Sequence, residues 1–410
     1  MIRVDKIIPG GFALGTDESG KKIFFWNALP GELVTDFRII KNKSSYTEAV
    51  ATKIESPSLR RKEPKDDCFL STSPWQILDY NYELEQKSLL TREIFREHGI
   101  NIEAPRIITD GKDYFYRNKM EYALYYDKEK QQIFPAFHAR GSHNKIPISS
   151  SSLERPEILE KAREIIDDLN ARGEEARKYQ SLLLRASQDG IVSGGLYENK
   201  KPHPTFDSLE DKILGQKYSY SPNGFFQINL PVYEMALREI KKFVTTEEVL
   251  DLYAGVGTIG LSVARDHRLT LVEVNKSAFD ELKKNCEQVF SEGIRSYDED
   301  ERADHVTTGV GDAPRRKTPA TILAKSEEVL RHITPNQTVI VDPPRAGCDR
   351  KLIDRILEIA PIKVIYLSCN PATQARDVKY LLRRYHIETI KTFNFFPHTP
   401  PIENLVVLSL

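Results

Sequence analysis

Cys369 is the residue of this sequence best placed for covalent chemistry. It directly follows the apolar run Val364–Ser368 and precedes Asn370-Pro371, a pair that favours a turn. A thiol at the end of a strand is expected at the rim of a sheet, where a thiolate can act as a nucleophile. The common alternative, a small buried apolar residue, fits Cys286 better because Cys286 lies within a helical pattern.

A second group of residues could bind a nucleoside cofactor. Gly255, Gly257 and Gly260 spell GxGxxG at the end of the predicted strand Glu248–Tyr253, as in dinucleotide sites. Asp251 would repel a pyrophosphate but suits the cationic amino-acid end of S-adenosylmethionine. S-adenosylmethionine is therefore favoured over a nicotinamide cofactor.

Two acidic residues end predicted strands of the same pattern. Glu273 ends the predicted strand Leu269–Glu273, where a carboxylate can accept hydrogen bonds from the ribose hydroxyls of either cofactor. Asp342 ends Thr338–Asp342 and is followed by two prolines, which fix the backbone and remove N–H donors. Such an Asp-Pro-Pro loop also occurs in enzymes that methylate exocyclic amines, so it does not identify the target atom.

A thiol beside a methyl donor suits a carbon that is too weak a nucleophile to react alone. C5 of uracil is such a carbon, and addition of a thiolate to C6 places electron density on C5. A base must then remove the C5 proton. Glu403, which follows the Pro-rich segment 395–402, is the candidate base, and His398 is the rival. On sequence alone, Glu403 is more typical of a surface glutamate at a strand start than of a base.

Composition limits the class of protein. The chain has 410 residues, of which 40% are apolar, so we expect two or three domains with packed cores. The formal net charge of -1 neither requires nor excludes a nucleic-acid partner. The sequence shows no secretory signal and no apolar run of about eighteen residues, so we expect a cytoplasmic protein without membrane spans.

The four cysteines, Cys68, Cys286, Cys348 and Cys369, are far apart and form no CxxC pair. The spacing therefore predicts no metal site, and the expected compartment predicts no disulfide. We expect no role for Cys348.

The elements that must position these residues are of two kinds. Residues 1–62 contain short apolar runs separated by glycines, which indicates a small β unit. Tyr82–His98 is a predicted helix, and Asp189-Gly190 a predicted hairpin turn. From Pro231 onward, short apolar strands alternate with helices, which predicts a doubly wound α/β sheet. Residues 291–336 are polar and are expected to face solvent mostly.

Six motifs, in this order, resemble the RNA uracil-5-methyltransferase family. They are YRNK (Tyr116–Lys119), FFQIN (Phe225–Asn229), DLYAGVGTIG (Asp251–Gly260), VDPPRAG (Val341–Gly347), SCNPAT (Ser368–Thr373) and FPHTPPIE (Phe396–Glu403).

The resemblance implies three domains with defined tasks. These are a TRAM-type RNA-binding β-barrel (1–62), a central α+β RNA-contacting domain (63–224) and a class I methyltransferase domain (225–410). The helical segment near 79–111 would pack on the catalytic domain. It also implies structured RNA as the partner, either transfer RNA or large-subunit ribosomal RNA, with no obligate protein partner.

The resemblance also implies roles for single residues. Cys369 would be the nucleophile, Glu403 the base, and Asp342 the residue that orients the uracil. The residues implied to hold S-adenosylmethionine are Gln227, Tyr253, Gly255, Glu273, Asp312 and Asp342. Arg117 and Lys119 would serve the RNA-facing central domain.

One departure from the family pattern concerns metal. Many members bind a [4Fe–4S] cluster through four cysteines, but the matching stretch Pro64–Trp75 has only Cys68, and the later one reads Ser149–Ser152. We therefore expect no cluster.

Two alternatives to uridine methylation stay open. One is an RNA methyltransferase of another base position, and the other is an RNA-binding or RNA-folding protein with a vestigial catalytic fold.

Overall fold

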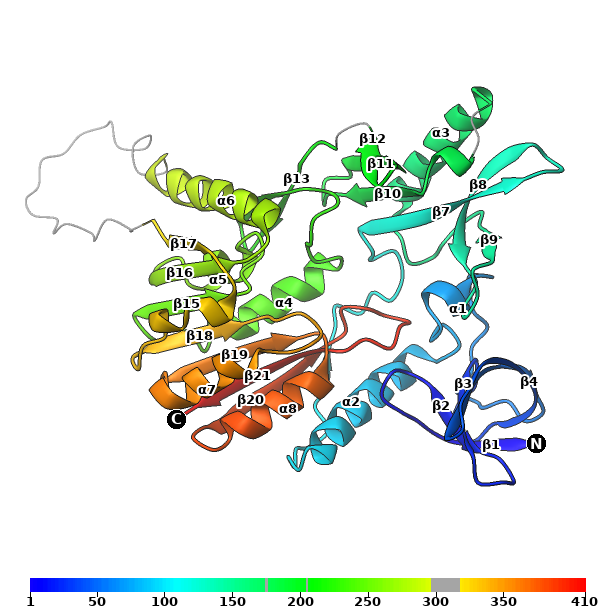
Figure 1. Ribbon diagram of the computed structural model, residues 1–410, viewed down its shortest axis with the longest axis horizontal. Helices are drawn as coiled ribbons and strands as arrows, with labels where there is room; N and C mark the ends of the chain where they lie inside the picture. The colour runs from blue at the N-terminus through cyan, green and yellow to red at the C-terminus, as the bar shows by residue number, and fades with distance from the viewer. Residues whose placement is uncertain (174–175, 204–205, 296–317) are drawn as a thin grey trace, which may run out of the picture. The chain divides into compact units, whose positions relative to one another are not determined.

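The computed structural model describes residues 1–173, 176–203, 206–295 and 318–410 (Figure 1). The chain forms two compact units. Unit 1 comprises Met1–Asp207 and Lys391–Glu403, and unit 2 comprises Ser208–Ile390 and Asn404–Leu410. No helix among the described residues is long and apolar enough to cross a membrane.

The N-terminal part of unit 1 is a closed barrel with strand order β1-β2-β3-β5-β4. Its strands are β1 (Ile2–Ile7), β2 (Ala13–Thr16), β3 (Lys22–Trp26), β4 (Leu33–Asn42) and β5 (Tyr46–Ile54). Alternate residues point inward, so Val4, Ile23, Phe25 and Ala49 form the barrel core. The small β-barrel predicted from the sequence is confirmed.

Helix α2 (Tyr80–Glu97) follows the barrel and the short helix α1 (Phe69–Thr72). The Asp79 side chain caps α2 by accepting a hydrogen bond from the backbone N–H of Tyr82. The chain then turns at Gly99, whose φ of 79° is a conformation that favours glycine. The predicted helix is therefore present and starts two residues earlier than expected.

The rest of unit 1 is built around an antiparallel sheet with strand order β12-β11-β10-β7-β8-β9. Helix α3 (Pro156–Ala171) packs on this sheet through Ile158, Ala162, Ile166 and Leu169. The predicted hairpin is present, with Gly190 at φ 84° in its turn. The strands are β7 (Lys119–Asp127), β8 (Gln132–His138), β9 (Lys145–Pro147), β10 (Ser181–Ala186), β11 (Val192–Glu198) and β12 (Lys201–His203), with a 3-10 turn at Ala176–Lys178.

Unit 2 contains the predicted doubly wound sheet, with strand order β17-β16-β15-β18-β19-β21-β20. Neighbours from β17 to β19 are parallel, whereas β21 runs antiparallel to β19. The strands are β15 (Glu248–Leu252), β16 (Arg268–Glu273), β17 (Ala320–Leu323), β18 (Gln337–Val341), β19 (Lys363–Ser368), β20 (His386–Phe393) and β21 (Glu403–Ser409). Strands β18 and β19 are buried along their whole length, as expected of strands covered on both faces.

Helices and a separate hairpin complete unit 2. Helix α4 contacts α5, and α7 contacts α8. The hairpin of β13 (Leu209–Ile213) and β14 (Gln216–Tyr220) contacts α6. The helices are α4 (Leu230–Lys241), α5 (Thr258–Val263), α6 (Lys276–Arg295), α7 (Arg350–Ile359) and α8 (Pro371–Leu381). Residues Thr392 and Phe393 of β20 belong to unit 1, where they pair with β6 (Ile107–Ile108).

Residues 318–336 are mostly exposed or partly exposed, as expected, but they also contain strand β17, which was not expected. Strand β17 pairs with β16 there, and Val329 and Ile333 are buried after it. The 3-10 turns Ser326–Glu328 and Leu330–His332 follow β17. The sequence signal is weak because β17 has four residues and none of them is fully buried.

Candidate active site

Cys369 lies in the turn between β19 and α8, at the carboxyl end of the parallel strands. Its side chain is partly exposed, whereas Cys286 is buried within α6. The side chain of Asn370 caps α8 by accepting a hydrogen bond from the Ala372 N–H, and the hydroxyl of Ser368 accepts one from the Asn370 N–H. The thiol therefore lies directly before a helix N-terminus, where the helix dipole favours a thiolate.

The Asp-Pro-Pro loop is tied to this turn by three side chains of the SCNPAT segment and α8. The amide of Asn370 and the hydroxyl of Thr373 donate to the carbonyl of Arg345, at 2.8 and 3.1 Å. Arg376 donates to the carbonyl of Ala346 at 3.0 Å. The structure thus brings together two motifs that are about two dozen residues apart in the chain.

Asp342 directly follows β18 at the start of this loop. Its side chain is only partly exposed, and burial raises the pKa of its carboxyl to about 7. Asp342 is thus a carboxyl that can be protonated near neutral pH and can then donate a hydrogen bond.

The glycine-rich turn follows β15, and strained backbone defines it. Tyr253, Gly255 and Gly257 all have positive φ, at 64°, 58° and 91°. A Cβ at Gly260 would lie 2.7 Å from Oδ2 of Asp251, whose carboxylate accepts the N–H of Gly260 at 2.8 Å. The last glycine of the motif therefore allows Asp251 to lie directly under the turn.

Asp251 and Glu273 place two carboxyl groups beside this turn. Asp251 is fully buried, its Oδ1 has no hydrogen-bond partner among the described residues, and burial raises its pKa to about 8. Glu273 accepts the N–H of Gly255 at 2.8 Å and that of Asn275 at 2.6 Å. Glu273 thus holds the glycine turn by accepting two backbone N–H groups.

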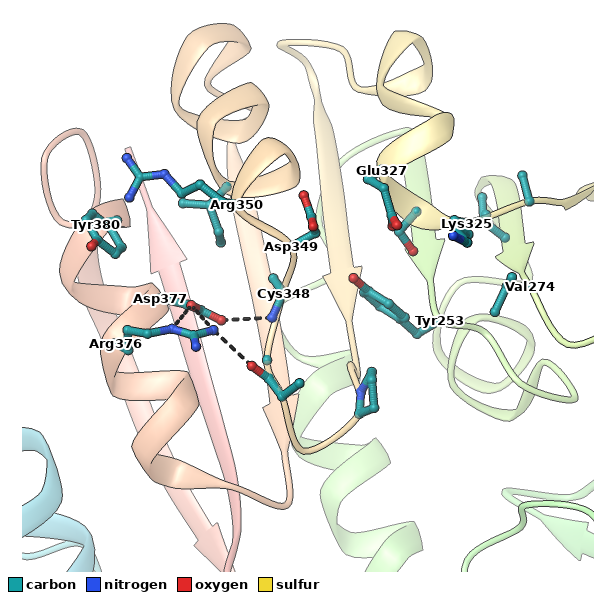
Figure 2. A pocket seen from close by; sticks show the side chains of 17 residues that line it. Tyr253, Val274, Lys325, Glu327, Cys348, Asp349, Arg350, Arg376, Asp377 and Tyr380 are labelled. Carbon is teal, nitrogen blue, oxygen red and sulfur yellow. Dashed lines mark hydrogen bonds and ion pairs between the residues drawn. The ribbon is translucent and has the colours of Figure 1, made fainter.

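A cavity of about 630 Å³ opens beside the turn and the Asp-Pro-Pro loop. In Figure 2, Tyr253 lies between Arg350, Arg376 and Tyr380 on one side and Val274, Lys325 and Glu327 on the other. Its lining residues are Tyr253, Val272, Val274, Ala324, Lys325, Ser326, Glu327, Pro344, Ala346, Gly347, Cys348, Asp349, Arg350, Ile353, Arg376, Asp377 and Tyr380. Tyr253 is the one predicted cofactor residue among them.

Cys348 lines this cavity, although no role was expected for it. Its backbone N–H donates to Asp377 at 2.9 Å, and the hydroxyl of Tyr366 donates to the same carboxylate at 2.9 Å. Burial raises the pKa of the Cys348 thiol, so Cys348 is a neutral part of the cavity wall.

The remaining predicted cofactor residues are placed differently. Gln227 is buried in the loop before α4, after Phe226, which stacks on Tyr220 with ring centroids 3.8 Å apart. Asp312 lies outside the described residues. The cavity residues that follow β17 are Ala324, Lys325, Ser326 and Glu327. They were not expected from the sequence, because β17 itself was not.

Glu403 and His398 belong to unit 1. Glu403 is buried, at 2% exposure, and begins β21. Asn404, the next residue, pairs with Ser368, the residue before Cys369. His398 is also buried, and its Nε2 lies 3.2 Å from Asp113.

The surroundings of Cys68 do not fit an iron–sulfur cluster. Asp66 accepts the N–H and the hydroxyl of Ser152 and the amide of Gln76, so hydrogen bonds join the two stretches. Burial raises the pKa of Cys68 to about 11, which favours the thiol over the thiolate that iron requires. Among the described residues, no group of three or more His, Cys, Asp or Glu side chains is arranged to hold a metal ion.

The absence of a cluster stays a prediction with a direct test. Protein purified without oxygen should contain no stoichiometric iron or sulfide and should show no absorbance band near about 400 nm, because one thiol cannot replace four thiolates. A stoichiometric iron content that is lost in Cys68→Ala would contradict it, and Cys286→Ala is the matched control.

The comparisons with known proteins agree on one family. Residues 207–410 match the family model described as tRNA (Uracil-5-)-methyltransferase. A protein of Bacteroides thetaiotaomicron named as an uncharacterized RNA methyltransferase is 27% identical over 95% of this chain and 96% of its own. One of Listeria monocytogenes with the same description is 27% identical over 100% of this chain and 97% of its own.

A solved structure matches the whole chain. It is the tRNA (uracil-54, C5)-methyltransferase of Pyrococcus abyssi in complex with S-adenosyl-L-homocysteine, with a TM-score of 0.71, 24% identity and coverage of 100% of both chains. This similarity confirms the fold. Residues 207–410 form a domain of the tRNA (uracil-5-)-methyltransferase family, and the chain as a whole is similar to bacterial RNA methyltransferases.

Proposed function

We propose that this protein transfers a methyl group from S-adenosylmethionine to C5 of a uridine in structured RNA, with Cys369 as the covalent nucleophile. The observation that carries the proposal is the position of Cys369. It is a partly exposed thiol before α8, in a turn that Asn370 and Thr373 tie to the Asp-Pro-Pro loop. An enzyme that methylates an amine would have no need of this thiol.

The residues around the glycine turn fit S-adenosylmethionine. When bound, this cofactor supplies an electrophilic methyl group on a sulfonium. The buried Oδ1 of Asp251, which lacks a hydrogen-bond partner among the described residues, suits a cationic ligand group. Glu273 has lone pairs left for ribose hydroxyls, and Val272 and Val274 offer an apolar wall for the adenine. The Pyrococcus abyssi enzyme binds S-adenosyl-L-homocysteine, which supports this choice.

The protein's own residues carry the chemistry on the RNA base. The thiolate of Cys369 adds to C6 of the uracil, which makes C5 nucleophilic toward the methyl group. Asp342, with a pKa of about 7, can donate a hydrogen bond to a uracil carbonyl where charge develops. Glu403 then removes the C5 proton, and the thiolate leaves as the C5–C6 double bond forms again.

Glu403 is proposed as the base because of its place in the chain. Cys369 follows Ser368, and Glu403 precedes Asn404, its register partner. Cys369 and Glu403 are therefore each bonded to one member of the same register pair, Ser368 and Asn404. His398 is less suited because its two ring nitrogens already face carboxylates, Glu83 at 3.5 Å and Asp113 at 3.2 Å.

An aromatic row on the barrel supports RNA as the substrate. Phe24 stacks on Tyr46 with centroids 5.1 Å apart, and Phe12 packs against Phe24 and Trp26 at 5.9 and 4.3 Å. Lys41 lies 5.6 Å from the centroid of the Tyr46 ring. Stacking rings flanked by a cation form a surface that suits unpaired bases. We therefore retain residues 1–62 as an RNA-binding domain, 63–224 as an RNA-contacting domain and 225–410 as the methyltransferase domain.

Cofactor affinity should depend on pH through Asp251. A cationic ligand favours the ionised carboxylate, whereas burial raises its pKa to about 8 without ligand. Binding therefore releases a proton below that pH, and affinity should rise as the pH increases from about 6 to 8. The free energy of unfolding should show the opposite trend. The pKa of Asp251 is higher in the folded protein than its unfolded value of about 3.9, so stability without ligand should fall as the pH rises over the same range.

Calorimetry with S-adenosylhomocysteine across this pH range would measure the dependence on Asp251. The matched variant is Asp251→Asn, because the ligand's own titration is common to both proteins. A pH dependence that is identical in the two proteins would contradict the role of Asp251.

The proposed function is tested by methylation and nucleoside mapping. Purified protein, S-adenosylmethionine labelled in its methyl group and unmodified transfer RNA should yield 5-methyluridine at one position. Transfer RNA is the first substrate to test because the family description names it, and large-subunit ribosomal RNA is the second. Label in another nucleoside would instead indicate a different target base, and binding of RNA without binding of S-adenosylmethionine would indicate a vestigial catalytic fold.

A further inference from the structure

A buried ion pair on helix α2 anchors a distant segment of unit 1. Lys87 and Glu83 are both fully buried, and their charged groups are 2.9 Å apart. The ammonium of Lys87 also donates to the side chain of Asn394 at 2.6 Å and to the carbonyl of Phe396 at 3.0 Å. All three ammonium protons of Lys87 therefore have acceptors. Two of these acceptors lie in segment 394–402, which directly precedes Glu403.

Glu83, the anionic partner in the ion pair, binds the same segment. Its Oε1 accepts the amide of Asn394 at 3.2 Å, and its Oε2 accepts the backbone N–H of His398 at 2.9 Å. The hydroxyl of Tyr116 donates to the carbonyl of Pro397 at 2.9 Å. The backbone N–H of Trp75 donates to the carbonyl of His398 at 3.0 Å.

The backbone of this segment needs such support because it contains strain. His398 has a φ of 59°, which an L-residue other than glycine adopts at a cost. Beyond it, Ile402 packs in a buried apolar cluster with Trp75 and Leu90. Segment 394–402 is therefore held from α2, from the loop at Trp75 and from Tyr116.

We propose that Lys87, acting with Glu83 through residues 394–398, is a positioning residue for the proton-abstraction step at Glu403. The inference rests on the proposed function, in which Glu403 is the base. Lys87 touches no reacting atom in this assignment. Its role is to hold segment 394–402 in place, so that Glu403, the first residue of β21, keeps its position.

The direction of the Glu403 side chain depends on how this segment is held, because Glu403 begins strand β21. Successive residues of a strand point to opposite faces, so a slip of one residue would turn the carboxylate away from its working side. Loss of Lys87 would leave Asn394 and the carbonyl of Phe396 without their ammonium donor and would leave Glu83 buried without its cation. The segment would then relax, and the base would move while the residues around Cys369 keep their own bonds.

The test separates the two halves of the reaction in the variant Lys87→Met. Single-turnover assays with the whole protein and the RNA that the methylation experiment selects would follow two rates. One is methyl incorporation, and the other is release of tritium from 5-tritiated uridine together with decay of the covalent adduct. Release should slow by about tenfold to a hundredfold, because a small misplacement of a catalytic group has that effect. Methyl incorporation should stay near the wild-type rate.

A general loss of stability would not give this pattern. The control is the double variant Glu32→Gln/Arg61→Met, which removes a partly buried ion pair of unit 1, with atoms 2.7 Å apart, that has no bond to segment 394–402. Its two rates should keep the wild-type ratio. Equal slowing of both rates in Lys87→Met, or no slowing of release, would overturn the inference.

A milder variant decides the matter if Lys87→Met does not fold. Tyr116→Phe removes only the hydroxyl that holds Pro397, and release should slow by about fivefold, the equivalent of one hydrogen bond. An unchanged ratio in Tyr116→Phe would then overturn the inference. Wild-type protein that forms no adduct at all would instead refute the proposed function.

Discussion

Replacing Cys369 with alanine should abolish methyl transfer to RNA, with a loss of at least about a thousandfold, as expected when a covalent nucleophile is removed. The physical reason is that C5 of uracil is not nucleophilic enough without the thiolate adduct at C6. The fold should be unaffected, because the side chain is partly exposed and the turn is held by Ser368 and Asn370. Binding of S-adenosylmethionine should therefore persist.

Trapping with 5-fluorouridine RNA would measure this loss directly. Wild-type protein should form an adduct that survives denaturing electrophoresis, because fluorine at C5 cannot be removed as a proton, and Cys369→Ala should form none. Cys286→Ala is the matched control, since Cys286 is buried in α6 away from the turn. Substantial methylation by Cys369→Ala would show that the thiol is not the nucleophile.

Replacing Glu403 with glutamine should cause the C5-methylated adduct to accumulate. Methyl transfer precedes proton abstraction in the proposed order, so the variant should complete the first half of the reaction and stall in the second. Turnover should fall by about a hundredfold to ten-thousandfold, the usual contribution of a general base. Quantifying adduct and released 5-methyluridine RNA over time would measure both effects.

Two further variants make the assignment of the base specific. Glu388→Gln changes a glutamate on β20 that bonds to Lys363 and Ser409, and it should release product normally. His398→Gln should slow release less than Glu403→Gln, because His398 is enclosed by Glu83 and Asp113. Normal turnover in Glu403→Gln with a stalled adduct in His398→Gln would reassign the base to His398.

The sequence predicted the elements whose burial is uniform. Strands β15, β18 and β19 read as apolar runs because both of their faces are covered. Helix α8 was not predicted, because two of its buried positions, Gln374 and Asp377, are polar. Polar residues at these positions interrupt the apolar period by which a helix is recognised. These side chains are buried because they bond to the backbones of Tyr366, Asn404 and Cys348, contacts that arise only in the fold.

The candidate site was predictable where a motif lies at the end of a strong strand. Cys369 and Asp342 follow β19 and β18, and the structure joins their loops as the α/β pattern requires. The cavity residues that follow β17 were not predictable, because β17 is short and partly exposed. Lys325 and Glu327 line the cavity there. Asp312 lies outside the described residues, so its role stays a prediction.

Unit 1 is assembled from parts of the chain that are made at very different times. Lys87 and Asn394, which share a hydrogen bond, are separated by 307 residues. During translation, α2 emerges early and must keep two charges hydrated until the residues that bury them leave the ribosome. A contact of such sequence separation also closes slowly. The nascent enzyme therefore cannot complete its first half before nearly all of its second half has been synthesised.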